Sequence, residues 1–303
     1  MTYSRVLEEV QQGHSTRKHL YELLEKEFDD KFSVVAFFTM FGHPRVYLDT
    51  GDADMLEEVL QNTDLSNREL LLILNCPGGD ALAAERIINV CRSFSPAGYS
   101  ALVPKQAKSA ATMICLGARK IMLSETSELG PIDPQIQYRN ATYAAHEIIE
   151  SYEDLFRKAI RSRGRIDPYL QQLNRFDARD IRWIRSAQQL SDSIALRVLG
   201  TGSMSGKRQS TIRKMIRPFL NPKYTKVHGR PIYHDVVERC GLPVRLFPIR
   251  SNLWKIVWEL YVRLNYAASG IRGSKIIESK YDHYVSPVPP FPSEGGATNE
   301  SKS

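Results

Sequence analysis

A Pro-Gly-Gly turn after the predicted strand at 70–76 has the residue types needed to present backbone N–H groups to a substrate. The turn lies in NCPGGD, residues 75–80. Glycines permit backbone conformations and close approaches that a Cβ atom forbids, and ligands of parallel α/β sheets gather at the carboxyl ends of strands. Such a turn, followed by a helix, leaves backbone N–H groups exposed and lets a substrate approach the chain closely. Taken alone, the turn is equally consistent with a tight connection from strand to helix.

Ser109 is the candidate nucleophile. It lies in KQAKSAATMICLGA at 105–118, where it opens a predicted helix of small residues directly after a strand. Its hydroxyl and the N–H of Ala110 therefore lie at a helix N-terminus, whose positive potential favours a developing oxyanion. The neighbouring alanines leave room for a peptide backbone across the serine. Taken alone, Ser109 is better interpreted as an N-cap serine without a chemical role.

A third turn, SELGPIDPQI at 127–136, contains two prolines and a glycine in a rigid connection that could border a cleft. In their order and spacing, the three turns resemble the Clp protease/crotonase superfamily. Within it they are most similar to the serine dehydrogenase proteinase family, whose members are relatives of signal peptide peptidase A. The resemblance covers residues 30–250, with its specific part at 71–136 and a weaker part in VHGRPIYHDVVERCGLPV at 227–244.

This resemblance implies a fold, a site and an activity. The fold would be α/β, with a Clp/crotonase-like ββα spiral, a parallel sheet and flanking N- and C-terminal helices. Ser109 would be the nucleophile, and the backbone N–H groups of Gly78, Gly79 and Ala110 would form the oxyanion hole. The substrate would be a peptide or protein. A homo-oligomer is implied, because superfamily members assemble into rings or stacked multimers.

The general base is harder to assign. A serine hydroxyl attacks a carbonyl usefully only when a neighbouring group takes its proton. The Clp branch uses a histidine in a segment that ends in proline, but GPIDPQ at 130–135 has none. The signal peptide peptidase branch uses a lysine on a later helix, which suggests Lys158 and a Ser-Lys dyad. Lys158 lies off the apolar stripe of its helix, however, and this position favours exposure to solvent.

Three further residues near these turns were weighed for the same site. His146, on the same helix as Lys158, is the runner-up base, and Lys108 precedes the nucleophile directly. Asp133 could order the site, but we interpret it as a turn-capping acid. His228 and His234 are interpreted as satisfying local hydrogen bonds. HExxH, paired CxxC, GxxxxGK[ST] and GxGxxG motifs are missing, so we expect neither a metal nor a cofactor.

The elements that must position these turns alternate along the first half of the chain. Strands apolar on both faces alternate with amphipathic helices, and this pattern predicts a parallel sheet covered by helices. The predicted strands are 33–40, 70–76, 99–104 and 120–124, and the helices between them are 55–64, 80–94 and 109–117. Beyond residue 141 the pattern is mainly helical, at 143–163, 166–174 and 177–200. A small unit at 228–250 has a helix around Asp235–Cys240 and then GLPVRLF.

These patterns divide the chain into four parts. We expect an N-terminal helical segment at 1–30, a Clp/crotonase-like protease domain at 31–250, and a C-terminal helical extension at 251–285. The extension contains NLWKIVWELYVRLNY at 252–266, a helix expected to pack in the core or in a subunit interface. The tail at 286–303 is rich in Pro, Gly and Ser, which predicts disorder.

Composition excludes several classes of protein. The 303 residues are 42% hydrophobic and 25% charged, as in globular proteins and unlike disordered or fibrous chains. No stretch is apolar enough for a membrane span, and the N-terminus lacks the apolar core of a signal peptide. Four cysteines at no metal-ligand spacing indicate buried thiols in a reducing compartment. We therefore expect a soluble cytoplasmic protein.

The net charge of +7 is concentrated in one block. Residues 206–230 contain eight Lys or Arg and no acid. Such a block could bind nucleic acid or another anionic surface, but a solvated face or a mobile loop is the favoured interpretation. The sequence as a whole predicts a serine peptidase. The alternatives are a catalytically silent scaffold of the same fold that binds extended peptides, and acyl-coenzyme A chemistry that uses the oxyanion hole without the serine.

Overall fold

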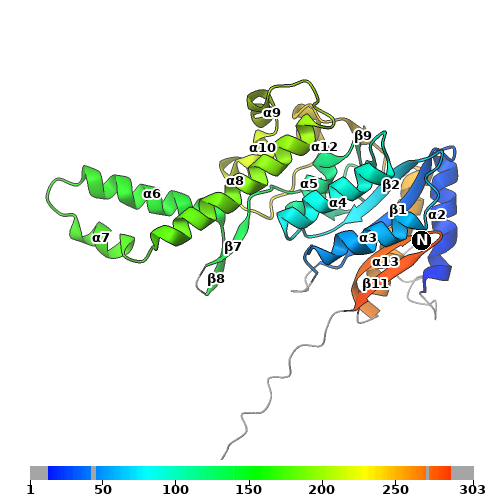
Figure 1. Ribbon diagram of the computed structural model, residues 1–303, viewed down its shortest axis with the longest axis horizontal. Coiled ribbons are helices and arrows are strands. Elements are labelled where there is room, and N and C mark those ends of the chain that lie inside the picture. The colour runs from blue at the N-terminus through cyan, green and yellow to red at the C-terminus, as the bar shows by residue number, and fades with distance from the viewer. Residues whose placement is uncertain (1–12, 42–45, 139, 271–272, 288–303) are drawn as a thin grey trace, which may run out of the picture.

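A seven-stranded sheet forms the centre of the protein (Figure 1). The computed structural model describes residues 13–41, 46–138, 140–270 and 273–287. In spatial order the strands are β11-β10-β1-β2-β3-β5-β9. Strands β1, β2, β3, β5 and β9 are parallel, and β10 and β11 are antiparallel to their neighbours. Their bounds are β1 Phe32–Thr39, β2 Glu69–Asn75, β3 Ser100–Leu102, β5 Lys120–Leu123, β9 Val244–Leu246, β10 Gly273–Ser279 and β11 His283–Pro287.

Helices cover both faces of this sheet because its central strands are apolar on both faces. In β2, Leu70, Leu72 and Leu74 join one buried cluster, whereas Leu71 and Ile73 join another. The first cluster includes residues of α3 (Gly51–Gln61), α4 (Ala81–Phe94) and α5 (Ala110–Gly117), and the second includes residues of α2 (His14–Glu27) and α13 (Asn252–Gly270). The predicted α/β class with a largely parallel sheet is confirmed.

Three helices form an arm that projects from the sheet, at the left of Figure 1. They are α6 (Ala145–Arg161), α7 (Asp167–Leu173) and α8 (Ala178–Gly200), and they confirm the helices predicted at 143–163, 166–174 and 177–200. A two-stranded sheet of β7 (Gln135–Tyr138) and β8 (Ala141–Ala144) lies at the base of the arm. The last part of α8 packs against α4 and α5. The arm is therefore anchored at the base that lies beside the sheet.

Short elements connect the arm to the end of the chain and frame the predicted turns. The basic block forms α9 (Gln209–Met215), α10 (Arg217–Leu220) and α11 (Pro222–Thr225), and α12 (His234–Arg239) follows. Ile212, Ile216 and Phe219 of the block are buried in the main hydrophobic cluster. The charged side chains of the block therefore belong to helices that pack against the rest of the fold. Strands β4 (Gln106–Ala107) and β6 (Glu128–Leu129) pair with each other beside the second and third turns.

The structure corrects the expected helical extension at 251–285. A helix is present only to Gly270, and β10 and β11 then join the main sheet beside β1. The apolar pattern does not predict β10 because two of its buried residues are charged. Lys275 and Glu278 are 4% and 0% exposed. Glu278 binds Arg17, with 2.6 Å between Nη2 and Oε2, and accepts a hydrogen bond from the Tyr21 hydroxyl. Strand β11 also extends into the expected tail, and residues 1–12 and 288–303 lie outside the described residues.

All four cysteines are buried free thiols, as predicted. Among the described residues, no helix combines the length and apolar character needed to cross a lipid bilayer.

Candidate functional site

Ser109 lies at a sharp turn between β4 and α5, in a backbone conformation that side chains rarely adopt. Its φ is 50° and its ψ is −120°. Such conformations cost about 1–3 kcal/mol, persist only where the surroundings enforce them, and cluster at active sites. Ser109 occupies the N-cap position of α5, but its side chain makes no capping hydrogen bond. The capping role that would have explained the serine structurally is therefore absent, and the half-buried hydroxyl is available for chemistry.

The Pro-Gly-Gly turn packs directly against this serine. A Cβ atom on Gly78 would lie 2.5 Å from the Lys108 carbonyl oxygen and 2.8 Å from the Ser109 Cβ. Gly78 has a φ of +95° and Gly79 a φ of +151°, so both positions favour glycine. The two turns that the sequence places 30 residues apart thus meet at backbone contact distance.

Leu48 holds the turn from the other side. Its N–H donates to the Gly78 carbonyl at 2.8 Å, and its own carbonyl accepts from the Asp80 N–H at 3.0 Å. Leu48 and Gly79 form a parallel bridge, and a Cβ on Gly79 would overlap the backbone N and O of Leu48. The orientation of the Gly79 peptide group is therefore fixed by backbone contacts on both flanks.

The structure separates the three expected oxyanion donors. The Gly78 N–H donates to the Cys76 sulfur at 3.3 Å, so it points into the fold. Gly79 and Ala110 line a cavity of about 810 Å³ together with Ser109. Among the described residues, neither of their N–H groups donates to a backbone carbonyl outside the regular helices and strands. Gly79 and Ala110 therefore stay candidates for the oxyanion hole, and Gly78 instead shapes the turn.

A buried carboxylate beside the cavity binds two histidines. Asp133, 4% exposed, lies 2.8 Å from Nδ1 of His228 through Oδ1 and 3.2 Å from Nδ1 of His146 through Oδ2. Burial alone would raise the pKa of Asp133, but the hydrogen bonds from both histidines lower it to about 2. Asp133 is therefore ionised at neutral pH and can stabilise a positive imidazolium. The expected turn-capping role of Asp133 is replaced by this contact.

The two histidines face different spaces. His228 lines the cavity that contains Ser109, whereas His146 lines a separate groove between α6, α8 and α10. Because Asp133 binds Nδ1 of His228, the ring nitrogen left for a substrate or for Ser109 is Nε2. No sequence pattern predicts this pairing, since His228 lies 95 residues after Asp133. The only signal was its place in the weaker part of the resemblance. His234, expected to satisfy a local hydrogen bond, has a buried Nδ1 without a partner among the described residues.

Lys158 does not have the environment that a lysine base needs. Its side chain is 56% exposed on the outer part of α6, and its Nζ lies 2.7 Å from the Asp154 carboxylate. The hydrogen bond that Lys158 donates to Asp154 raises the pKa of Lys158, whereas a base must be neutral when the reaction starts. A Ser-Lys dyad requires a lysine with a lowered pKa. Asp154, one helical turn away, instead raises the pKa of Lys158 and keeps its ammonium charged.

Lys108 is buried beside the serine but is already engaged. Its Nζ lies 2.9 Å from the Glu128 carboxylate and donates to the Leu129 carbonyl at 3.2 Å. Burial lowers its pKa, and the Glu128 carboxylate opposes that shift. We therefore assign Lys108 to holding the third turn against the serine. Among the described residues, no group of three or more His, Cys, Asp or Glu side chains is arranged to hold a metal ion.

Comparison with known proteins agrees with this geometry. Residues 37–166 match the family described as ClpP-like SDH-type serine proteinases. Over these residues, which are less than half of the chain, the sequence is similar to that family. The matched segment contains the Pro-Gly-Gly turn, Ser109, Asp133 and His146, and it ends before His228. The match to the ClpP-like SDH-type serine proteinases supports a serine peptidase in general and does not assign the base.

Individual relatives match only parts of the chain. Two uncharacterized proteins of Methanocaldococcus jannaschii are 39% identical over 82 residues and 34% identical over 98 residues. These alignments cover 27% and 32% of the present chain, and the same shares of the relatives. Among solved structures, a mutant of the membrane-bound stomatin-specific protease 1510-N is 19% identical, with a TM-score of 0.29. That match covers 38% of the present chain and 61% of the other.

The Gly79 turn gives a first prediction. Replacing Gly79 by valine, or even by alanine, puts a Cβ into the Leu48 backbone, so the Gly79 N–H must rotate away from the cavity. Loss of one oxyanion donor lowers turnover on the order of 100-fold or more, and we expect that loss in the hydrolysis of fluorescently labelled casein. Gly200→Ala is the matched control, because a Cβ there makes only an ordinary contact. Normal turnover by a folded Gly79→Ala enzyme would place the oxyanion hole elsewhere.

Proposed function

We propose that this chain is a serine peptidase in which Ser109 is the nucleophile, His228 the general base and Asp133 the residue that orients His228. The observation that carries the proposal is that Ser109 and His228 line one cavity while the buried Asp133 carboxylate binds His228 through Nδ1. This arrangement has the three roles of a serine-histidine-aspartate triad. It replaces the Ser-Lys dyad that the sequence suggested.

The proposed reaction moves one proton through His228. The Ser109 Oγ attacks the carbonyl carbon of the peptide bond while its proton passes to Nε2 of His228. The carbonyl oxygen becomes an oxyanion, which the N–H groups of Gly79 and Ala110 stabilise. His228 then gives the proton to the leaving amine as the C–N bond breaks. Water hydrolyses the resulting acyl-enzyme by the same route, with His228 again as the base.

The charge of Asp133 supports this assignment over a lysine base. An imidazole can accept a proton near neutral pH without the deep burial that a lysine needs. The pKa of about 2 keeps Asp133 negative throughout that range, so it stabilises the imidazolium that forms during the reaction.

A silent peptide-binding scaffold is the second candidate. Among the described side chains, no hydrogen bond joins the Ser109 hydroxyl to a base. Catalytic hydrogen bonds are often long without substrate and tighten in the complex, so this observation does not exclude an active enzyme. A fluorophosphonate, which reacts covalently with activated serines, distinguishes the two candidates.

Ser109→Ala should abolish both hydrolysis and fluorophosphonate labelling while leaving stability unchanged. The hydroxyl makes no capping bond, so its loss removes the nucleophile and no structural contact. We would measure labelling by intact-mass spectrometry and the melting temperature by circular dichroism. Labelling of the wild type at another residue, or undiminished labelling of the mutant, would remove Ser109 from the nucleophile role.

The base is tested by three variants assayed side by side. His228→Gln should lower kcat by on the order of 100- to 10,000-fold, as expected for the loss of a general base. Lys158→Met should retain wild-type kcat because the lysine is exposed and paired with Asp154. His146→Gln should have a smaller effect than His228→Gln, since His146 lies outside the Ser109 cavity. A kcat loss in Lys158→Met alone would restore the dyad, and a loss in His146→Gln alone would move the base to His146.

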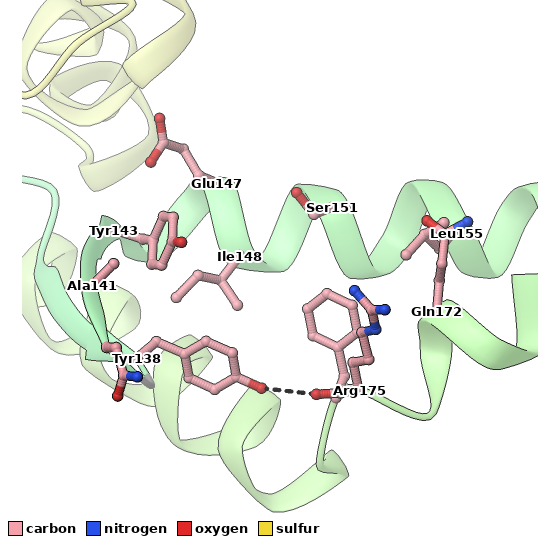
Figure 2. Close-up of a pocket in the computed structure, with 11 residues that line it drawn as sticks. Tyr138, Ala141, Tyr143, Glu147, Ile148, Ser151, Leu155, Gln172 and Arg175 are labelled. Atoms are coloured by element: carbon pink, nitrogen blue, oxygen red, sulfur yellow. Dashed lines mark hydrogen bonds between the residues drawn. The ribbon is translucent and has the colours of Figure 1, made fainter.

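We also infer that the arm joins two copies of this chain, which supports the expected homo-oligomer. None of the residues of α7 is buried. Apolar side chains are exposed along the arm, among them Phe156, Ile160, Leu170 and Trp183. A cavity of about 560 Å³ lies between α6, the β7–β8 hairpin and the segment that joins α7 to α8. Figure 2 shows residues that line it, among them Tyr138, Ile148 and Leu155. Exposed apolar side chains that gather on one part of a surface are typical of interaction sites.

The charges of α6 favour a second copy as the occupant. The first half of the helix is acidic and the second half basic, with Glu147, Glu150, Glu153 and Asp154 followed by Arg157, Lys158 and Arg161. Two α6 helices related by a two-fold axis perpendicular to them run antiparallel, so each acidic half would lie against the basic half of its partner. The same axis brings the exposed apolar residues of both arms together.

Charges placed in this surface should dissociate the oligomer. We expect Phe156→Glu/Ile160→Glu to lower the mass measured by light scattering to that of one chain, with unchanged circular dichroism. Ile249→Glu is the control, because Ile249 is also an exposed apolar residue but lies outside the arm. A monomeric wild type, or an unchanged mass for the double variant, would contradict self-association through the arm.

A further inference from the structure

We propose that Lys275 is a positioning residue for the oxyanion hole: its buried ammonium holds the segment that fixes the direction of the Gly79 N–H. The inference rests on the proposed serine peptidase function, and it assigns a part in that function to a strand outside the matched family segment. Lys275 lies in β10, opposite Thr39 at the carboxyl end of β1. This is the edge of the sheet from which the Pro-Gly-Gly turn emerges.

Lys275 is the centre of a buried ion cluster. Its Nζ lies 2.9 Å from both carboxylate oxygens of Asp52 and 2.8 Å from Oδ2 of Asp49. Lys275 is 4% exposed and Asp52 fully buried, whereas the Asp49 side chain is 65% exposed. The Asp52 carboxylate also accepts a hydrogen bond from the Asp49 backbone N–H at 2.8 Å. The cluster therefore fixes both the side chain and the backbone of Asp49.

The backbone of Asp49 leads directly to the site. Leu48, the preceding residue, donates to the Gly78 carbonyl and accepts from the Asp80 N–H, so it holds the turn on both sides of Gly79. A Cβ on Gly79 would overlap Leu48, so the two backbones have no room to slide. A shift of the Asp49 backbone must therefore move Leu48 and rotate the peptide group that presents the Gly79 N–H.

Loss of the ammonium would disturb this path. Without Lys275, the buried Asp52 carboxylate has no cation, and removing one partner of a buried ion pair is strongly unfavourable. The start of α3 and the Asp49 backbone must then rearrange to hydrate or protonate Asp52. Misplacement by about 1 Å at a catalytic group can cost on the order of 100-fold in rate.

The test must separate positioning from general stability. We would measure the labelling kinetics of Ser109 with an alkyl fluorophosphonate, whose phosphoryl oxygen takes the oxyanion position. In Lys275→Met, the maximal labelling rate constant kinact should fall by on the order of 10- to 100-fold, with KI unchanged. The matched control is Arg17→Met, which breaks the buried ion pair to Glu278 in the same strand. Its melting temperature should fall while kinact stays at the wild-type value.

Two further variants keep the test decisive if Lys275→Met folds poorly. The double variant Lys275→Met/Asp52→Leu removes both buried charges, so it should regain stability while kinact stays low. Lys275→Arg keeps a cation and should restore a large part of kinact. The proposal is overturned if the double variant is stable and labels at the wild-type rate, or if Arg17→Met loses kinact as Lys275→Met does. A wild type that is not labelled at all overturns the peptidase function itself and this proposal with it.

Discussion

The close contact of two backbones, one at Gly78 and one at residues 108–110, is the constraint on which the site depends. A single added carbon at Gly78 would overlap the Lys108 carbonyl and crowd the Ser109 Cβ. Because the turn and the serine touch without intervening side chains, the Gly79 and Ala110 N–H groups can share one cavity with the Ser109 hydroxyl. The rest of the fold acts as a frame that holds these backbones in contact.

Three groups of buried charged side chains lie close to the site. Asp133 is buried with two histidines, Lys108 with Glu128, and Lys275 with Asp52. Buried pairs of this kind add little net stability, but removing one member is costly. They therefore hold backbone segments in one arrangement. All three flank the turns around Ser109, so each holds a backbone segment next to the site.

Local features of the chain were predictable from sequence, and contacts between distant segments were not. The strands and helices before residue 124 follow from apolar periodicity, and Ser109 and the glycine turn each lie within one short motif. The partnership of Asp133 with His228 joins residues 95 positions apart, and no periodicity encodes it. Strand β10 was not predicted because its charged residues, which are usually exposed, are buried in ion pairs. Lys158 was assigned by its order along the chain, which does not reveal that Asp154 pairs with it.

The position of β10 in the sheet has a consequence for how the protein is made. Phe37 of β1 pairs with Ile277 of β10, 240 residues later in the chain. At the usual speed of synthesis, on the order of 5–20 residues per second, β1 emerges from the ribosome tens of seconds before its neighbour. During that interval an apolar strand edge is open to other chains. The nascent protein is therefore prone to aggregate through the unpaired edge of β1 until β10 is synthesised. Chaperones that cover strand edges would bind the chain during this time.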